Sequence, residues 1–280
     1  TSGTVQVGRP VYVGCDTTMP DYQYVGVIID YTTRSKNKFA TNEFYDGSMM
    51  KGIAFVSAEQ AADNSSYTEH FVILFNNGKL YECAVTYRGN AKTDISVTLG
   101  DYVETGLDAS NGASMTLVGE NELAIALNTA SGVELYSYDL TTNTATKQST
   151  VADAQTLIGL SMLSEVRPEL VPEEPEQPPV EPEEPSEDTW LHGYIKTGSG
   201  YAWAMINSAT GEYEVLSEGT VKYDGGGYSN GKIYTSVTEY GQPSVYEVDP
   251  ANGYAATAGF MDDINFAKMM DLASGTAKTV

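Results

Sequence analysis

The chain contains 280 residues, of which 41% are hydrophobic, and its 38 acidic residues outnumber its 15 Lys and Arg residues to give a formal net charge of −23. This composition is typical of a folded protein with a substantial core, and the negative charge excludes nucleic acid and anionic membrane surfaces as partners. No run of about 18 apolar residues occurs, so no transmembrane segment is predicted, and the first residues lack the basic and apolar regions of a signal peptide. A mature exported chain that begins after its signal peptide would start in the same way.

Strand signals run along the whole chain. Short stretches in which Tyr, Val, Ile and Thr alternate with polar residues are separated by turns of Asn, Gly, Asp and Ser. Helical signals are scarce, and the one stretch with some helical character is SAEQAADNSS, residues 57–66, which is long enough for one or two turns within a loop. We therefore expect an all-β protein.

One pattern recurs along the chain: a strand, a turn built on Asp or Asn, and a second strand. In chain order the copies occupy residues 24–44, 80–97, 135–150, 202–219 and 245–259, the second of them divergent. Another strand precedes each copy, and in four copies a further short strand precedes that one, at residues 52–57, 114–119, 156–163 and 222–229. Units of four strands at intervals of about 40 to 50 residues are typical of the blades of a β-propeller.

The first copy lacks the leading strand, whereas the chain ends with an additional one in NFAKMMDLASGTAKTV, residues 265–280. A ring of blades has to close. We therefore expect five four-stranded antiparallel blades, with the C-terminal strand completing blade one. A six-bladed ring and two separate half-propellers are the alternatives.

Residues 171–188, VPEEPEQPPVEPEEPSED, contain six prolines and eight acidic residues. Such a segment cannot bury enough apolar surface to fold, and it predicts an extended, self-repelling tether. Because it falls between the first and second strands of one blade, we expect a loop within a single propeller domain of residues 1–280. A linker between two domains and a proline-rich ligand for an SH3-like partner are the alternatives.

Every connection between blades contains an aspartate. In a four-stranded blade these connections share one face with the loops between the second and third strands, while the Asp-turn hairpins lie on the opposite face. If the aspartates surround the mouth of the central channel, their oxygens could bind calcium or act as acid and base on a glycoside. Aspartate is also a default turn residue, so a solvated acidic rim is the simpler interpretation. The candidates are Asp46, Asp108, Asp153, Asp224 and Asp263, the last beside Asp262.

Aromatic residues form the second group of candidates. The chain has 20 tyrosines and only seven phenylalanines, an excess that favours rings with one polar edge, as in binding grooves. Aromatic side chains are also ordinary strand residues, so packing within the sheets is the alternative. The candidates for stacking on a ligand are Trp190, Trp203, Tyr45, Tyr223 and Tyr228.

The cysteines and histidines indicate no special chemistry. Cys15 and Cys83 lie in apolar strand-like runs and are expected to be free, buried thiols, with a disulfide between them as the alternative. With only two histidines, His70 and His192, a zinc site of Cys and His ligands is not expected, and both histidines are interpreted as structural.

The units with turns DLTTNT, SATGE and DPANG resemble the generic repeats of bacterial extracellular propellers. The stretch LSEGTVKYDGGGYSNGKIYTSVTEYGQPSVYEVDPANG resembles blades of surface lipoproteins of Bacteroidota, most of which have no assigned function. This resemblance implies an exported protein, periplasmic, extracellular or at the cell surface, that captures a ligand for an outer-membrane transporter. It transfers no site residues.

We therefore expect a monomeric, non-catalytic binding module that needs no cofactor, with calcium as the one candidate ion. Its partner would be a glycan, a small ligand or a surface protein. The alternative is a secreted carbohydrate-active enzyme that uses carboxylates around the channel.

Overall fold

The computed structural model describes residues 4–15, 26–30, 35–39, 50–63, 65–88, 94–161, 189–229, 232–239, 242–259 and 268–278. For the strands within residues 4–39 and 268–278, the description covers the backbone and its pairing. No helix in these described segments has the length and hydropathy needed to span a membrane.

The described strands form five sheets of four antiparallel strands each. One sheet contains β4 (Met50–Gln60), β5 (Ser66–Phe75), β6 (Lys79–Arg88) and β7 (Asp94–Glu104). The next contains β8 (Ala113–Leu117), β9 (Glu122–Thr129), β10 (Gly132–Asp139) and β11 (Thr144–Val151). It is followed by β12 (Thr156–Ser161), β13 (Trp190–Thr197), β14 (Gly200–Asn207) and β15 (Tyr213–Gly219). Another consists of β16 (Gly226–Ser229), β17 (Lys232–Glu239), β18 (Gln242–Asp249) and β19 (Ala255–Gly259), with the 3₁₀ turn η1 (Pro250–Asn252) before β19. The remaining sheet has the order β20-β1-β2-β3, from β20 (Lys268–Lys278), β1 (Thr4–Cys15), β2 (Gly26–Asp30) and β3 (Ser35–Phe39).

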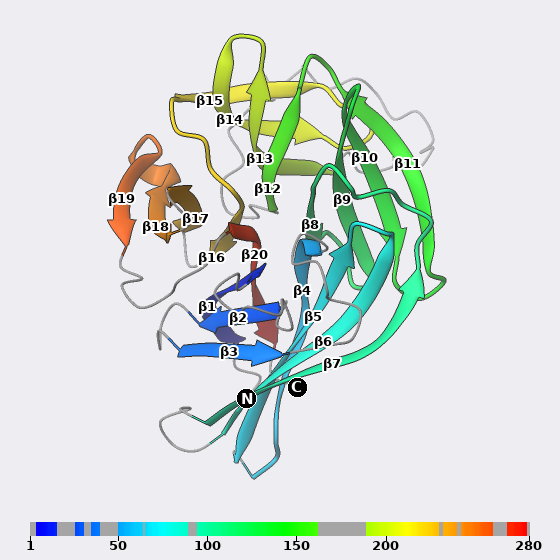
Figure 1. Ribbon diagram of the computed structural model, residues 1–280, viewed down its shortest axis with the longest axis vertical. Helices are drawn as coiled ribbons and strands as arrows, with labels where there is room; N and C mark the ends of the chain where they lie inside the picture. The colour runs from blue at the N-terminus through cyan, green and yellow to red at the C-terminus, as the bar shows by residue number, and fades with distance from the viewer. Residues whose placement is uncertain are drawn as a thin grey trace, which may run out of the picture.

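The sheets are arranged around a common axis, with one edge strand of each toward the centre (Figure 1). The inner strands lie side by side in succession: β4 contacts β8, β8 contacts β12, and β12 contacts β16. The inner strand β20 contacts both β16 and β4. The sheets β4–β7, β8–β11, β12–β15 and β16–β19 are thus blades of a β-propeller.

The expected all-β propeller with four-stranded antiparallel blades is confirmed. Four blades have described side chains, β4–β7, β8–β11, β12–β15 and β16–β19, one fewer than the five expected. The sheet β20-β1-β2-β3 is described by its pairing, in which β1 and β20 run antiparallel from Thr4 opposite Lys278 to Cys15 opposite Lys268. The five-bladed ring closed by this strand stays a prediction.

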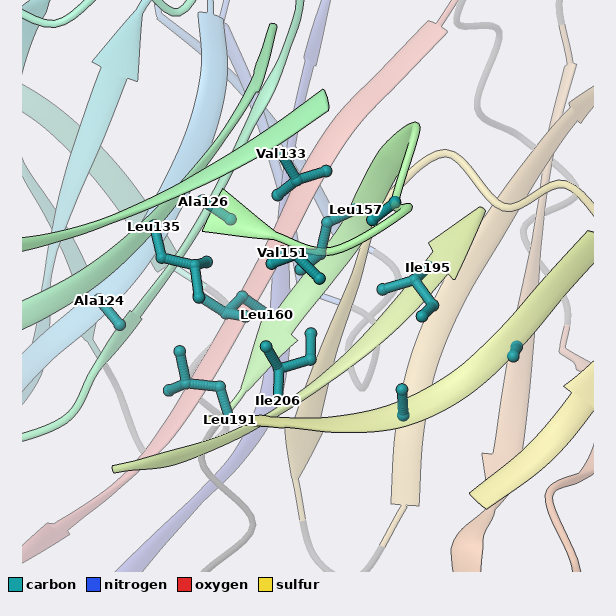
Figure 2. Close-up of a cluster of buried hydrophobic side chains, with 13 residues drawn as sticks. Ala124, Ala126, Val133, Leu135, Val151, Leu157, Leu160, Leu191, Ile195 and Ile206 are labelled. Atoms are coloured by element: carbon teal, nitrogen blue, oxygen red, sulfur yellow. The ribbon is translucent and has the colours of Figure 1, made fainter. Parts of the chain in front are cut away.

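Buried apolar clusters lie between neighbouring blades. Figure 2 shows one of them, in which Val133 and Leu135 of β10 lie near Leu157 of β12 and near Leu191 and Ile195 of β13. All five side chains are at most 1% exposed. Burying a side chain of this size stabilises a fold by about 1.5–3 kcal/mol, so each blade depends on its neighbour for its core.

The helical turn expected within residues 57–66 is wrong. Ser57–Gln60 form the end of β4, where Ala58 pairs with Glu69 and Gln60 pairs with Tyr67 of β5. A segment this short gains little from helix formation because nucleation of a helix is costly, whereas pairing with β5 satisfies its backbone groups at once.

The acidic tether of residues 171–188 lies outside the described residues. The strands before and after it, β12 and β13, are antiparallel neighbours in one sheet, with Ser161 opposite His192.

Candidate functional site

Hydrogen bonds between loops define the two faces of the ring. The backbone N–H of Thr105, which follows β7, donates to the carbonyl of Gly78 in the turn between β5 and β6, at 2.9 Å. On the other face, the N–H of Leu140 after β10 donates to the carbonyl of Asn121 before β9, at 2.8 Å. The connections between blades therefore share a face with the turns between second and third strands, as the sequence predicts.

A pocket of ≈ 390 Å³ lies on this first face, where the inner strands β4, β8 and β12 begin. It is also lined by the loop between β7 and β8, by the end of β13, and by the loop between β15 and β16. We call it the inner-strand pocket. Its volume lies within the usual range for small-molecule sites, about 300–1,000 Å³.

The walls of the inner-strand pocket are joined by side-chain hydrogen bonds between blades. The amide of Asn128, at the end of β9, donates to the carbonyl of Leu157 at 3.1 Å and accepts from its N–H at 2.8 Å. The hydroxyl of Ser114 accepts from the N–H of Gly159 at 3.0 Å. These bonds fix the starts of β8 and β12 relative to each other, so this part of the pocket is preformed.

Four charged side chains line the pocket: Lys51 of β4, Lys196 of β13, and Lys222 and Asp224 of the loop between β15 and β16. Lys51 and Lys196 are half-buried and Lys222 is exposed. The backbone N–H of Asp224 donates to the carbonyl of Ser236 at 2.9 Å, which anchors this residue to β17. Its Oδ2 atom is buried and has no hydrogen-bond partner within the described part of the chain. A buried carboxylate oxygen costs free energy unless it accepts a hydrogen bond, so this atom requires a donor.

Aromatic packing anchors the loop that carries Lys222 and Asp224. The hydroxyl of Tyr194 donates to the carbonyl of Val221 at 2.7 Å, and burial raises the pKa of Tyr194 well above its ordinary value. Tyr223 is 5% exposed, and its ring centroid lies 5.0 Å from that of Tyr194. Burial also raises the pKa of Tyr223, so both phenols are neutral at physiological pH. Tyr201 is half-buried and lines the pocket.

Two of the predicted site residues, Asp224 and Tyr223, line the inner-strand pocket. Trp203 is not a lining residue: its side chain is 5% exposed, and its ring lies 5.8 Å from the ring of Tyr223. Tyr228 is half-buried and packs against the same aromatic cluster between the last two described blades. Trp190 is 38% exposed and stands at the first residue of β13, whose other end carries Lys196.

Two predicted aspartates, Asp108 and Asp153, are described outside the pocket, and both are turn residues. Asp108 is exposed, and its carboxylate accepts from the backbone N–H of Ser110 at 3.0 Å, which lowers its pKa. Asp153 is exposed in the turn between β11 and β12, with φ of 58°. Asp46, Tyr45, Asp262 and Asp263 lie outside the described residues.

No group of three or more His, Cys, Asp or Glu side chains in the described segments could hold a metal ion. Calcium binding by the full set of predicted aspartates stays a prediction, because two of them are not described. Both histidines lie in strands, His192 in the interior of β13 and His70, with a side chain 40% exposed, in β5. Cys83 is a free, buried thiol, as expected. The side chain of Cys15 is not described.

The sequence interpretation missed the three lysines of the pocket and Asn128. Lysine is scarce in this chain. The position of Lys196 and Lys222 at the edges of two strand motifs is the only local feature that could have marked them as site residues. Their common location depends on how three blades are arranged, and a single sequence does not contain that information.

Two other pockets lie among the described residues. One, of ≈ 540 Å³, lies between the blades β4–β7 and β8–β11 and is lined by His70, Glu82 and Asp101, among others. The second lies on the opposite face at β8–β11, where Glu120 and Asp139 are among the lining residues.

No family model and no curated protein matches the chain. Among solved structures, TolB from Acinetobacter baumannii is similar with a TM-score of 0.43 and 9% identity, covering 95% of this chain and 66% of that one. A chain of a nidogen/laminin complex is similar with a TM-score of 0.48 and 9% identity, covering 98% of both chains. A Bacteroides thetaiotaomicron protein of unknown function is similar with a TM-score of 0.39 and 11% identity, covering 79% of this chain and 48% of that one. The chain therefore spans about two thirds of the first of these structures and about half of the third.

Proposed function

We propose that this protein is a non-catalytic binding module that captures a glycan in the inner-strand pocket. The observation that carries the proposal is the buried Oδ2 atom of Asp224, which lacks a donor among the described residues and belongs to a pocket wall. A sugar hydroxyl supplies such a donor.

The rest of the lining supports a sugar ring. The half-buried Tyr201 provides aromatic surface in the lining of the pocket, and the apolar face of a sugar packs well on such surface. Asn128 presents its amide at the junction of two blades, where its bonds to Leu157 hold it in one orientation. A preformed pocket of this kind binds a ligand without losing much free energy to the ordering of the protein.

Binding without catalysis is favoured because Asp224 is the single carboxylate among the described residues of this pocket. Cleavage of a glycoside ordinarily requires two carboxyl groups, about 5–9 Å apart, one of which has a raised pKa. The proposed module needs no cofactor and acts as a monomer.

The proposal includes a closed five-bladed ring in one domain of residues 1–280. The contacts of β20 with β1, β4 and β16 support closure by the C-terminal strand. The acidic tether of residues 171–188 would be a loop between β12 and β13, which the pairing of these two strands supports. We further propose an exported, surface-attached protein that supplies its glycan for uptake, and fractionation of the producing cells would test that location.

The test is binding of neutral and acidic oligosaccharides, measured by thermal shift and calorimetry on the wild type and on Asp224→Asn. We expect Asp224→Asn to weaken binding at least about tenfold, because a hydrogen bond to a charged group contributes about 1.5–3 kcal/mol. Asp108→Asn and Asp153→Asn are matched controls, since both carboxylates are exposed in turns, and they should bind as the wild type does.

Three outcomes would contradict the proposal. These are an absence of binding by the wild type, equal affinity of Asp224→Asn, and release of cleaved sugar during the assay. The last outcome would establish the enzyme alternative. Millimolar calcium in parallel samples tests the predicted ion, because a ligand specific for the folded state raises the midpoint of unfolding.

A further inference from the structure

The inner-strand pocket is positively charged in a strongly acidic chain. Lys51, Lys196 and Lys222 line it together with one carboxylate, Asp224, whereas the whole chain has a formal net charge of −23. Three of the chain's 15 basic residues therefore gather around one cavity of ≈ 390 Å³. Two further pockets of the described residues have the opposite charge, with Glu82 and Asp101 in one and Glu120, Glu122 and Asp139 in the other.

Lys196 and Lys222 form no ion pair with any residue that the structure describes. Elsewhere in the same segments lysines do pair with carboxylates: Lys147 lies 2.6 Å from Glu134, and Lys232 binds Asp249. Two lysines that line the same pocket without a carboxylate partner make the local potential more positive, which favours an anionic ligand.

The backbone positions of both lysines are fixed. Lys196 pairs with Tyr201 and Thr156 in neighbouring strands, and its carbonyl accepts from the N–H of Gln155 at 2.7 Å. Lys222 follows Val221, whose carbonyl accepts the hydrogen bond from Tyr194. The two lysines thus line one pocket from separate, anchored elements, an arrangement suited to a single anionic group.

We propose that the ligand is an acidic sugar, whose carboxylate or sulfate binds Lys196 and Lys222 while a hydroxyl donates to Asp224. The proposal rests on the proposed function of this pocket and specifies its ligand class. A single anionic group on an otherwise neutral ring fits best, because the negative charge of the whole protein repels polyanions at long range. The carboxylate of Asp224 provides the second contact, which has the opposite charge. The pocket therefore recognises both the charge and the orientation of the sugar.

The experiment measures affinity for matched pairs of sugars by calorimetry: glucuronate against glucose, galacturonate against galactose, and galactose 6-sulfate as the sulfate probe. We expect each acidic sugar to bind at least about tenfold more tightly than its neutral partner, from charge-assisted hydrogen bonds to the lysines. Lys196→Gln/Lys222→Gln should abolish this preference. The matched control is Lys147→Gln, which removes the same charge outside the pocket and should retain the preference.

Lys222→Gln alone serves as a second variant, because Lys222 is exposed and its replacement should not affect folding. It should reduce the preference several-fold. A preference for carboxylate over sulfate, or the reverse, identifies the anionic group.

Equal affinity for acidic and neutral sugars overturns this inference and leaves the binding module intact. The same conclusion holds if the preference persists in Lys196→Gln/Lys222→Gln. Failure of every sugar to bind overturns the binding module itself, and with it the inference.

Discussion

The imidazole of His192 and the phenol ring of Tyr254 stack face to face across two blades, with planes 1° apart and centroids at 5.6 Å. His192 Nε2 also lies within hydrogen-bond distance of the Tyr254 hydroxyl, at 3.1 Å. Trp203 stacks on both rings, with its centroid 5.4 Å from that of His192 and 5.6 Å from that of Tyr254. The stack joins β13 and β14 to the turn before β19, and it accounts for the structural role that the sequence predicts for His192.

Acid should destabilise the protein through His192. Burial lowers the pKa of His192 to about 3, whereas the unfolded chain has the ordinary value near 6.5. Below about pH 6.5 the unfolded state therefore binds a proton on His192 that the folded state excludes. The free energy of unfolding consequently falls by about 1.4 kcal/mol per pH unit until His192 is also protonated in the folded state.

Urea unfolding between about pH 7.5 and 5.5 checks this slope, since most carboxylates stay ionised in that window. His192→Phe keeps an aromatic ring but cannot titrate, so its slope should be shallower than that of the wild type. His70→Gln is the control, because His70 is 40% exposed in its side chain. Identical slopes for the wild type and His192→Phe would show that His192 does not control the pH dependence.

Cys83 should resist thiol reagents in the folded protein. Its side chain is 2% exposed, and burial raises its pKa to about 12, so the reactive thiolate is scarce at neutral pH. In a Cys15→Ser background, Ellman's reagent should label Cys83 only after denaturation. Rapid labelling of the native variant would mean that the surrounding core opens readily.

Gly159→Ala should be strongly destabilising. The residue has a φ of 65°, and a Cβ there would lie 2.8 Å from the Cα of Gly226 in the next inner strand. The left-handed backbone and the clash together predict a loss on the order of 2–4 kcal/mol in the free energy of unfolding.

Denaturant unfolding measures this loss. Gly198→Ala is the matched control, since a Cβ there would meet no atom within 4 Å, and its stability should stay close to that of the wild type. A similar, small effect of both substitutions would show that β12 and β16 are not in such close contact.

Removal of residues 265–280 should abolish cooperative unfolding. This truncation deletes β20, which pairs with β1 and contacts β4 and β16, so three sheets would lose a neighbour at once. Calorimetry should show a broad transition or none. A truncated protein that unfolds in one sharp transition would rule out ring closure by this strand.

Deletion of residues 171–188 should change stability little. About ten residues would still connect β12 to β13, whose adjacent ends pair through Ser161 and His192, and the cost of loop closure depends weakly on length. The midpoint of thermal unfolding checks this expectation. A large fall would assign the segment a packing role within the ring.

Much of the fold was predictable because strand and turn signals are local. The period-two runs around Val72, Leu127 and Ile195 lie in β5, β9 and β13, and the Asp-turn at Asp249 caps η1 by accepting from the N–H of Ala251 at 3.0 Å. The prediction failed at residues 57–60, where weak helical propensity competes with pairing to the next strand of a hairpin. Pairing with β5 outweighs that propensity, and propensity scales do not include it.

The candidate site was predictable only in part. Asp224 and Tyr223 were found because they lie in a glycine-rich connection between blades, where turn residues draw attention. Asp108 and Asp153 share that signal, yet their carboxylates stay outside the pocket. Turn chemistry locates a loop and does not reveal which way its side chains point.

The sequence by itself determined the all-β class, the four-stranded unit and the order of the strands, because alternation and turn chemistry act over a few residues. Only the tertiary structure decided that Lys51, Lys196 and Lys222 surround one cavity with Asp224. These residues are far apart in the chain, and electrostatic attraction depends on distance in space. The packing of inner strands from different blades therefore creates a positively charged pocket in a chain whose composition alone predicts an acidic surface.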